Sequence, residues 1–119
     1  MKVLVAEDNT MVREAMVTLI ESHGHLVVPA IDGKQAAECL NFLNFDLVVT
    51  DNDMPYLTGL ELAELCREKG TLFVMQSAKN ISAQADEASA YQFIYKKDLF
   101  KKLPPLLRDV QDFVDHRYN

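Results

Sequence analysis

Residues 47–55 read LVVTDNDMP, a run of strand-forming apolar residues that ends in two acids and a proline. Such a run predicts a buried strand that delivers Asp51 to the point where the chain leaves the sheet. Alone, Asp51 would be read as an ordinary strand-end residue that caps a turn. The first strand changes this interpretation, because the apolar residues 3–6 (VLVA) are likewise followed by paired acids, Glu7 and Asp8. Three carboxylates at the ends of buried strands predict a cation site.

The composition is that of one ordinary globular domain. The chain has 119 residues, of which 49% are hydrophobic and 25% charged, so we expect a single domain over residues 1–119. The net charge of -6 argues against a nucleic-acid partner for this domain, because phosphate binding depends on surplus lysine and arginine. A late group of basic residues fits a protein-docking surface. These residues are Lys96, Lys97, Lys101 and Lys102.

Cysteine usage and hydropathy indicate the cellular compartment. Cys39 and Cys66 lie in helical patterns without the CxxC spacing of a redox or metal motif, which suits a reducing cytoplasm. No apolar run approaches the roughly 20 residues that a membrane-spanning helix needs, and the chain leads straight from Met1 into a strand pattern. The sequence therefore predicts a cytoplasmic protein without a membrane partner.

Strand and helix patterns alternate along the chain. The strand patterns cover residues 2–6, 26–31, 46–50, 71–75 and 92–95, and a helical pattern follows each. Pro29 predicts that the second strand lies at a sheet edge, where a missing backbone donor matters least. The polar stretch 79–90 predicts a short, loosely packed helix that starts near Ile81. Pro104 and Pro105 are expected in the first turn of the last helix, because proline disrupts a helix interior.

This alternation predicts a parallel sheet with helices on both faces. The expected fold class is α/β, a flavodoxin-like, doubly wound, five-stranded parallel sheet with strand order 2-1-3-4-5 and five helices. In such sheets, binding sites form beyond the carboxyl ends of the strands, where the strand order reverses. That edge would bring together polar residues from strands one, three, four and five. These residues are Glu7, Asp8, Asp51, Ser77 and Lys96.

Several motifs share their order and spacing with one known family. They are the acidic pair Glu7-Asp8, Asp51-x-x-Met54-Pro55 with Gly59, Ser77-Ala78, and Phe93-x-x-Lys96. Each motif is weak alone, but together and in this order they are highly specific. Over residues 1–116 the chain resembles a receiver domain of bacterial two-component response regulators, of the stand-alone, single-domain type.

The resemblance implies a phosphorylation-dependent signalling switch in a two-component phosphorelay. Asp51 would accept a phosphoryl group from a histidine kinase or a histidine phosphotransfer protein. The domain would then signal through contact with a downstream protein target. It would not be a turnover enzyme, although the phosphorylated form could hydrolyse its own phosphoryl group.

The same resemblance assigns roles to the residues around Asp51. The cofactor would be Mg²⁺, held by the carboxylates of Asp8 and Asp51 and the backbone carbonyl of Asp53, with Glu7 acting through water. Lys96 and Ser77 would contact the phosphoryl oxygens. On phosphorylation, Ser77 would swing inward and Phe93 would rotate into the space that this movement vacates.

The chemistry agrees with these roles. A carboxylate can accept a phosphoryl group, but several acids in one pocket repel an anionic phosphate. A hard cation neutralises that repulsion, Lys96 adds a point charge, and Ser77 adds a hydrogen bond. Taken singly, Lys96 is an ordinary strand-end lysine and Ser77 an ordinary turn residue. Their convergence above three acids favours the functional interpretation.

Two features depart from the family pattern. Lys97 stands where the family usually has a proline after a cis peptide bond. A cis bond before a non-proline residue costs about 2.5 to 4 kcal/mol, so we expect a trans Lys96-Lys97 bond with Lys96 still directed at Asp51. The segment between Ser77 and Lys96 is also shorter than the family norm, which affects the fourth helix and any partner specificity built on it.

Two other functions fit parts of the sequence. A phosphotransferase of the haloacid dehalogenase type has an apolar strand that ends in Asp-x-Asp, with Asp51 as nucleophile and Asp53 as acid and base here. That fold usually places the motif near the start of a longer chain. The other alternative is a receiver-like interaction module that is never phosphorylated, against which the complete acidic set argues. Turnover of phosphoesters would indicate the enzyme, one long-lived phosphorylation the receiver, and no phosphate uptake the module.

Overall fold

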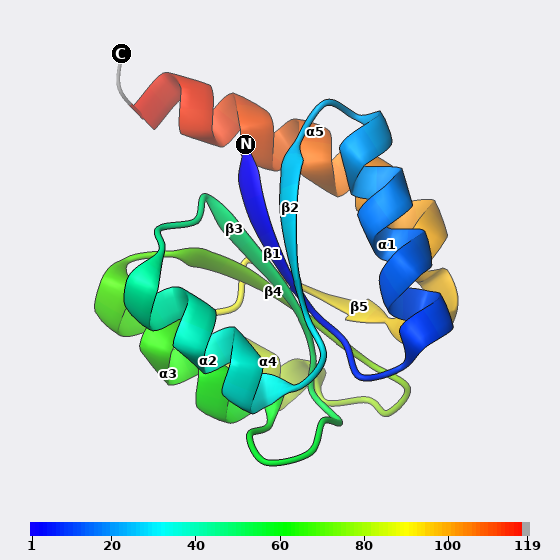
Figure 1. Ribbon diagram of the computed structural model, residues 1–119, viewed down its shortest axis with the longest axis vertical. Helices are drawn as coiled ribbons and strands as arrows, with labels where there is room; N and C mark the ends of the chain where they lie inside the picture. Colours follow the sequence, from blue (N-terminus) through cyan, green and yellow to red (C-terminus); the bar gives the residue numbers. More distant parts are fainter. Residues whose placement is uncertain (118–119) are drawn as a thin grey trace.

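Five strands and five α-helices alternate along residues 1–117, the part of the chain that the computed structural model describes (Figure 1). The strands are β1 (Lys2–Ala6), β2 (Leu26–Ala30), β3 (Leu47–Asp51), β4 (Leu72–Ser77) and β5 (Gln92–Tyr95). The helices are α1 (Thr10–Ser22), α2 (Gly33–Phe42), α3 (Gly59–Lys69), α4 (Ser82–Glu87) and α5 (Leu99–Arg117). A 3₁₀ turn, η1 (Lys96–Asp98), joins β5 to α5. The predicted alternation is confirmed.

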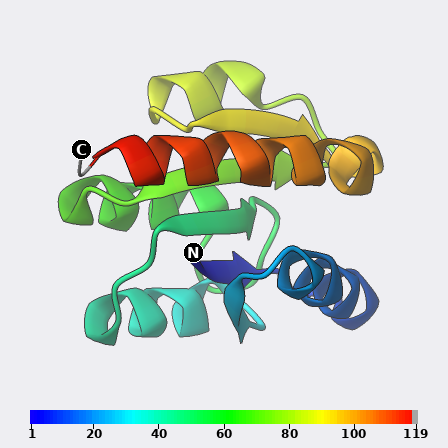
Figure 2. The same ribbon diagram turned by 90° about the horizontal axis from the view of Figure 1, so that it is seen from above.

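All five strands lie parallel in one sheet with the order β2-β1-β3-β4-β5. The predicted strand order and the flavodoxin-like class are therefore confirmed. Figure 2 shows the arrows of β1, β3 and β5 pointing toward the same edge of the sheet. In the register, Ala6 pairs with Thr50, and Asp51 pairs with Gln76. The residues that end β1, β3 and β4 consequently lie side by side at the carboxyl edge.

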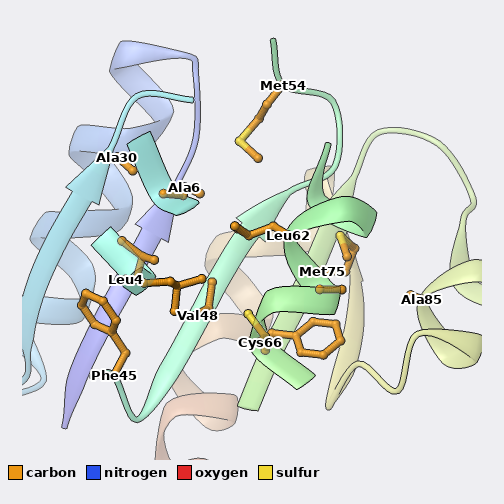
Figure 3. Packing of buried hydrophobic residues seen from close by; sticks show 14 residues of the cluster. Leu4, Ala6, Ala30, Phe45, Val48, Met54, Leu62, Cys66, Met75 and Ala85 are labelled. Carbon is orange, nitrogen blue, oxygen red and sulfur yellow. The ribbon is translucent and has the colours of Figure 1, made fainter. Parts of the chain in front are cut away.

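Helices cover both faces of this sheet. α1 and α5 lie on one face, and α2, α3 and α4 lie on the other (Figure 1). An apolar cluster fills the space on each face. On the α3 side, Leu4 and Val48 point from the sheet toward Leu62 and Cys66 (Figure 3). All five residues of β3 are buried, as expected for a strand that helices cover on both faces.

β2 is an edge strand, as Pro29 predicts. Pro29 pairs with Val5 of β1 and is exposed, so its missing N–H leaves no buried partner unsatisfied. The strand ends at Ala30, one residue before the predicted end at Ile31. β3, which carries Asp51, lies at the centre of the sheet, two strands away from this edge.

The last helix contradicts the prediction for Pro104 and Pro105. α5 starts at Leu99, directly after η1, so both prolines lie inside the helix and beyond its first turn. They leave the carbonyls of Phe100 and Lys101 without the usual N–H partners. Because Phe100 and Lys101 are exposed, water can satisfy these carbonyls. Burial of Leu99 against the sheet stabilises the additional N-terminal turn.

The polar stretch 79–90 forms one short helix, as predicted. α4 has six residues, and Ile81 at its N-cap provides no side-chain hydrogen bond. Every peptide bond in the described chain is trans, so the expectation for Lys96-Lys97 is confirmed. None of the described helices is both long and apolar enough to cross a membrane.

Candidate functional site

Within the described residues, three acidic side chains meet at the carboxyl edge of β1 and β3. Glu7, Asp8 and Asp51 each place one carboxylate oxygen within 4.8 Å of the other two. Glu7 and Asp51 are only 0% and 1% exposed, whereas Asp8 is exposed to solvent. The pairing of β1 with β3 brings these residues together although they are distant in sequence. The acids that the sequence analysis identified thus form one cluster, hereafter the acidic cluster.

Asp51 ends β3 and is held by hydrogen bonds to both carboxylate oxygens. Its Oδ1 accepts the backbone N–H of Asp53 at 3.1 Å, and its Oδ2 accepts Lys96 Nζ at 3.1 Å. Lys96 also forms an ion pair with Glu7 Oε1 at 2.8 Å. The predicted contact between Lys96 and Asp51 is therefore present with a trans Lys96-Lys97 bond. The neighbouring Lys97 turns to the Tyr95 ring, with its ammonium 5.7 Å from the ring centroid.

The charges in the acidic cluster are unbalanced. Burial, and then the proximity of Asp51, raises the pKa of Glu7 to about 7, although Lys96 acts in the opposite direction. Burial lowers the pKa of Lys96, but its hydrogen bonds to Glu7 and Asp51 outweigh burial and raise it. One ammonium group thus faces a cluster of three carboxyl groups. The cluster can accommodate additional positive charge.

The donor set fits a magnesium ion. Apart from the ion pair with Lys96, neither carboxylate oxygen of Glu7 has a hydrogen-bond partner in the described chain, and both are buried. Such oxygens are costly to bury unless water or a cation satisfies them. Magnesium prefers hard carboxylate oxygens and retains several waters, and the exposed Asp8 leaves the cluster open to solvent. These features agree with the predicted cofactor.

Asn52 fixes the loop after β3, a role that the sequence analysis did not identify. Its backbone N–H donates to the Gln76 carbonyl at 3.0 Å, and its side-chain oxygen accepts the Leu60 N–H at 3.0 Å. Its carbonyl accepts the Gly59 N–H at 3.2 Å. A Cβ atom on Gly59 would lie 2.7 Å from the Asp51 carbonyl oxygen, so glycine is needed there for close packing. Asn52 thereby ties the end of β3 to the start of α3.

Ser77 reaches the site but is hydrogen-bonded to Asp53. Its Oγ donates to Asp53 Oδ2 at 3.1 Å and accepts the backbone N–H of Lys79 at 3.1 Å. The Asp53 carboxylate therefore points toward Ser77, and Asp53 lies outside the acidic cluster. This leaves its backbone carbonyl as the group that the family resemblance assigns to the metal. An inward swing of Ser77 would have to break the bond to Asp53.

Phe93 lies half-buried on β5, beside a groove. Its ring packs edge to face against Tyr95, with ring centroids 5.2 Å apart and planes at 74°. The groove has a volume of about 430 Å³ and runs between α4 and β5. Small or polar side chains line its α4 side, among them Ser82, Ala83 and Asp86. Phe93 therefore has open space next to it, and its predicted rotation stays a prediction.

Arg13 is a second residue that the sequence analysis missed. Its Nη1 donates to the Glu7 carbonyl oxygen at 2.9 Å and to the Asp8 carbonyl oxygen at 3.4 Å. The sequence does carry a signal. A cation in the first turns of a helix is disfavoured by the helix dipole, so a basic residue there, just after an acidic pair, indicates a specific contact.

Comparison with known proteins identifies one family. The family model of the response regulator receiver domain matches residues 3–106. The two-component response regulator PhoP of Pseudomonas aeruginosa is 28% identical over 124 residues, which cover 96% of this chain and 55% of PhoP. This chain thus spans about half of the length of that relative.

Solved structures match almost the whole chain. The receiver domain of the Francisella response regulator 1452 has a TM-score of 0.88 at 26% identity, and the match covers 95% of this chain and 98% of that one. TrrA, a response regulator of Thermotoga maritima solved in complex with Mg(2+)-BeF, has a TM-score of 0.82 at 26% identity. That match covers 92% of this chain and 97% of TrrA.

Proposed function

Because this chain belongs to the response regulator receiver family, we propose that Asp51 is the phosphoacceptor of a two-component signalling switch. A phosphohistidine on a histidine kinase or a histidine phosphotransfer protein would supply the phosphoryl group. In the transfer, the P–N bond of the donor breaks and a P–O bond forms to a carboxylate oxygen of Asp51. The observation that carries the proposal is the position of Asp51 inside the acidic cluster and in contact with Lys96.

Contact with Lys96 does not by itself single out Asp51, because Glu7 makes the same contact. Two features separate the carboxylates. Burial raises the pKa of Glu7, which disfavours the ionised form that a nucleophile needs. Asp51 also occupies the Asp-x-x-Met-Pro motif that receiver domains share, on the loop that Asn52 and Gly59 fix.

Mg²⁺ would be held by the carboxylates of Asp8 and Asp51 and the backbone carbonyl of Asp53, with Glu7 acting through water. When bound, the ion offsets the charge of the acids and of the incoming phosphoryl group. Lys96 already lies 3.1 Å from Asp51 Oδ2, where its ammonium can stabilise a phosphoryl oxygen. The complex of TrrA with Mg(2+)-BeF supports this assignment.

The switch would start at Ser77. A phosphoryl group adds up to about two negative charges, and the Ser77 hydroxyl would exchange its bond to Asp53 for a bond to a phosphoryl oxygen. Phe93 would then turn within the groove between α4 and β5. Because phenylalanine has no hydroxyl group, the signal would pass through packing alone. A downstream protein would read the altered surface of α4, β5 and α5.

The proposal extends to the setting of the domain. Residues 1–119 would form one receiver domain that acts in the cytoplasm. With a net charge of -6, its partners would be proteins rather than nucleic acids. The receiver family consists of signalling switches that are generally not turnover enzymes, which argues against the haloacid dehalogenase alternative.

A beryllofluoride titration followed by NMR tests this proposal. Beryllofluoride mimics a phosphoryl group on a carboxylate. With Mg²⁺ present, the side-chain signals of Ser77 and Phe93 should shift in the wild type and stay unchanged in Asp51→Asn. Asp109→Asn is the control, because it removes an exposed acid of α5 that does not line the groove beside Phe93. Unchanged Ser77 and Phe93 signals with Asp51 occupied would refute the switch, and no binding at Asp51 would favour the unphosphorylated module.

A further inference from the structure

We infer that Arg13 is a positioning residue that holds the backbone of Glu7 and Asp8 in the arrangement that magnesium binding requires. The inference rests on the proposed function, since it gives Arg13 a role in the same site. Arg13 would contact neither the ion nor the phosphoryl group. It would act through the peptide units that carry two of the three acids.

The contacts of Arg13 go to backbone oxygens rather than to carboxylates. Its Nη1 donates to the Glu7 carbonyl oxygen at 2.9 Å and to the Asp8 carbonyl oxygen at 3.4 Å. Its Nη2 donates to Thr10 Oγ1 at 3.5 Å. Lys96, by contrast, contacts the carboxylates of the acidic cluster directly. Arg13 therefore leaves the carboxylate oxygens available to a metal ion.

These carbonyls lie where the sheet stops supporting the chain. β1 ends at Ala6, and the Glu7 N–H makes one further bond to the Ala30 carbonyl at 3.1 Å. Asp8 then lies between the strand and Asn9, whose side chain caps α1 by accepting the Val12 N–H at 3.0 Å. The guanidinium of Arg13 bridges this short connection to the first turns of α1. It thereby fixes the connection that carries the exposed Asp8.

The dipole of α1 disfavours a cation at the position of Arg13. The N-terminus of a helix carries partial positive charge, so a cation in the first turns is destabilising unless it is paired. No acidic residue lies in the first turn of α1 to compensate. Hydrogen bonds from a charged donor to two carbonyl oxygens offset this cost. The sequence thus places a cation where specific contacts, rather than helix stability, favour it.

If Arg13 positions the metal ligands, its loss should have the opposite effect on magnesium affinity from the effect expected if it acts only through its charge. Loss of one positive charge beside an acidic cluster should tighten the binding of a cation. Loss of a group that orients the ligands should weaken it, and the loss of such an outer contact typically costs about tenfold in metal affinity. The sign of the change in Arg13→Gln therefore separates the two roles.

The experiment is isothermal titration calorimetry with MgCl₂ on the full chain. Lys34→Gln is the matched control, because Lys34 is an exposed cation in the first turn of α2 at the same edge of the sheet. We expect Arg13→Gln to weaken magnesium binding roughly tenfold and Lys34→Gln to leave it equal or slightly tighter. Arg13→Lys keeps the charge but loses the planar fork of donors, so its affinity should fall between those of the wild type and Arg13→Gln.

An affinity of Arg13→Gln equal to that of Lys34→Gln would overturn the inference and leave the proposed function intact. Failure of the wild type to bind magnesium would overturn both. If Arg13→Gln does not fold, Arg13→Lys decides the matter, and wild-type affinity in that variant would contradict the inference. Amide hydrogen exchange without metal gives an independent readout, because the N–H groups of Glu7 and Val12, which are hydrogen-bonded at the two ends of this connection, should exchange faster in Arg13→Lys than in the wild type.

Discussion

Glu7 is a carboxyl group that folding removes from water completely. Burial, together with the nearby Asp51, raises its pKa from the ordinary value of 4.5 to about 7. Between these values the folded protein binds more protons than the unfolded chain. Stability therefore falls as the pH rises through this interval, and the loss is complete above the folded pKa. Glu7 thus supplies a carboxylate to the acidic cluster, and in its ionised form it destabilises the metal-free fold.

The variant Glu7→Gln should therefore stabilise the metal-free protein at about pH 8, by an amount on the order of 1 kcal/mol or more. The gain should shrink as the pH falls toward 5, because wild-type Glu7 then becomes protonated in the folded state. Urea unfolding in the presence of a chelator measures both values. Glu68→Gln, which removes an exposed carboxylate of α3, is the control. A gain that is independent of pH, or equal in the control, would contradict this account of Glu7.

At the scale of elements, α2 and the loop after β3 meet at Gly33. A Cβ atom there would lie 2.0 Å from the Leu57 carbonyl oxygen, a backbone atom that cannot yield without moving the loop. We therefore expect Gly33→Ala to destabilise the fold by about 1 to 3 kcal/mol, despite the better helix propensity of alanine. Urea unfolding gives the value.

Gly70→Ala is the matched comparison for this prediction. Gly70 has a φ of +66° with no atom within 4 Å of an added Cβ, so alanine there costs backbone strain without a clash. Gly33→Ala should also increase hydrogen exchange of the loop amides, such as that of Asp53, whereas Gly70→Ala should not. Unchanged loop exchange in Gly33→Ala would show that the close approach is relieved elsewhere.

Local patterns predicted the order of the strands and helices well, and the structure shows the side chains that fix their ends. Asn9 caps α1, and the buried run of β3 marks the centre of the sheet. The prolines of α5 misled the sequence analysis, because proline chemistry places them in a first turn while the burial of Leu99 extends the helix ahead of them. The burial of Leu99 outweighed the preference of proline for the first turn of a helix. The strength of that burial depends on tertiary contacts, which cannot be derived from the local sequence.

At the scale of the whole molecule, the strand order determines which residues converge. Once a parallel sheet of order 2-1-3-4-5 is expected, Glu7, Asp8 and Asp51 must meet at its carboxyl edge. The contact between Lys96 and Asp51 was expected from the sequence, but the other partners in the site were not predictable. Lys96 also pairs with Glu7, which lies near the other end of the sequence, and Arg13 contacts backbone carbonyls instead of carboxylates. Such choices depend on side-chain packing, which the order of strands does not specify.

Asp51 is proposed to accept a phosphoryl group in a magnesium-dependent reaction. Intact-protein mass spectrometry after incubation with acetyl phosphate and MgCl₂ tests it most directly, with Asp51→Asn and the exposed control Asp86→Asn in parallel. The wild type and Asp86→Asn should each gain one phosphoryl group, and removal of magnesium with a chelator should abolish the gain. Asp51→Asn should gain none. Equal labelling of Asp51→Asn and the wild type would contradict the assignment of Asp51.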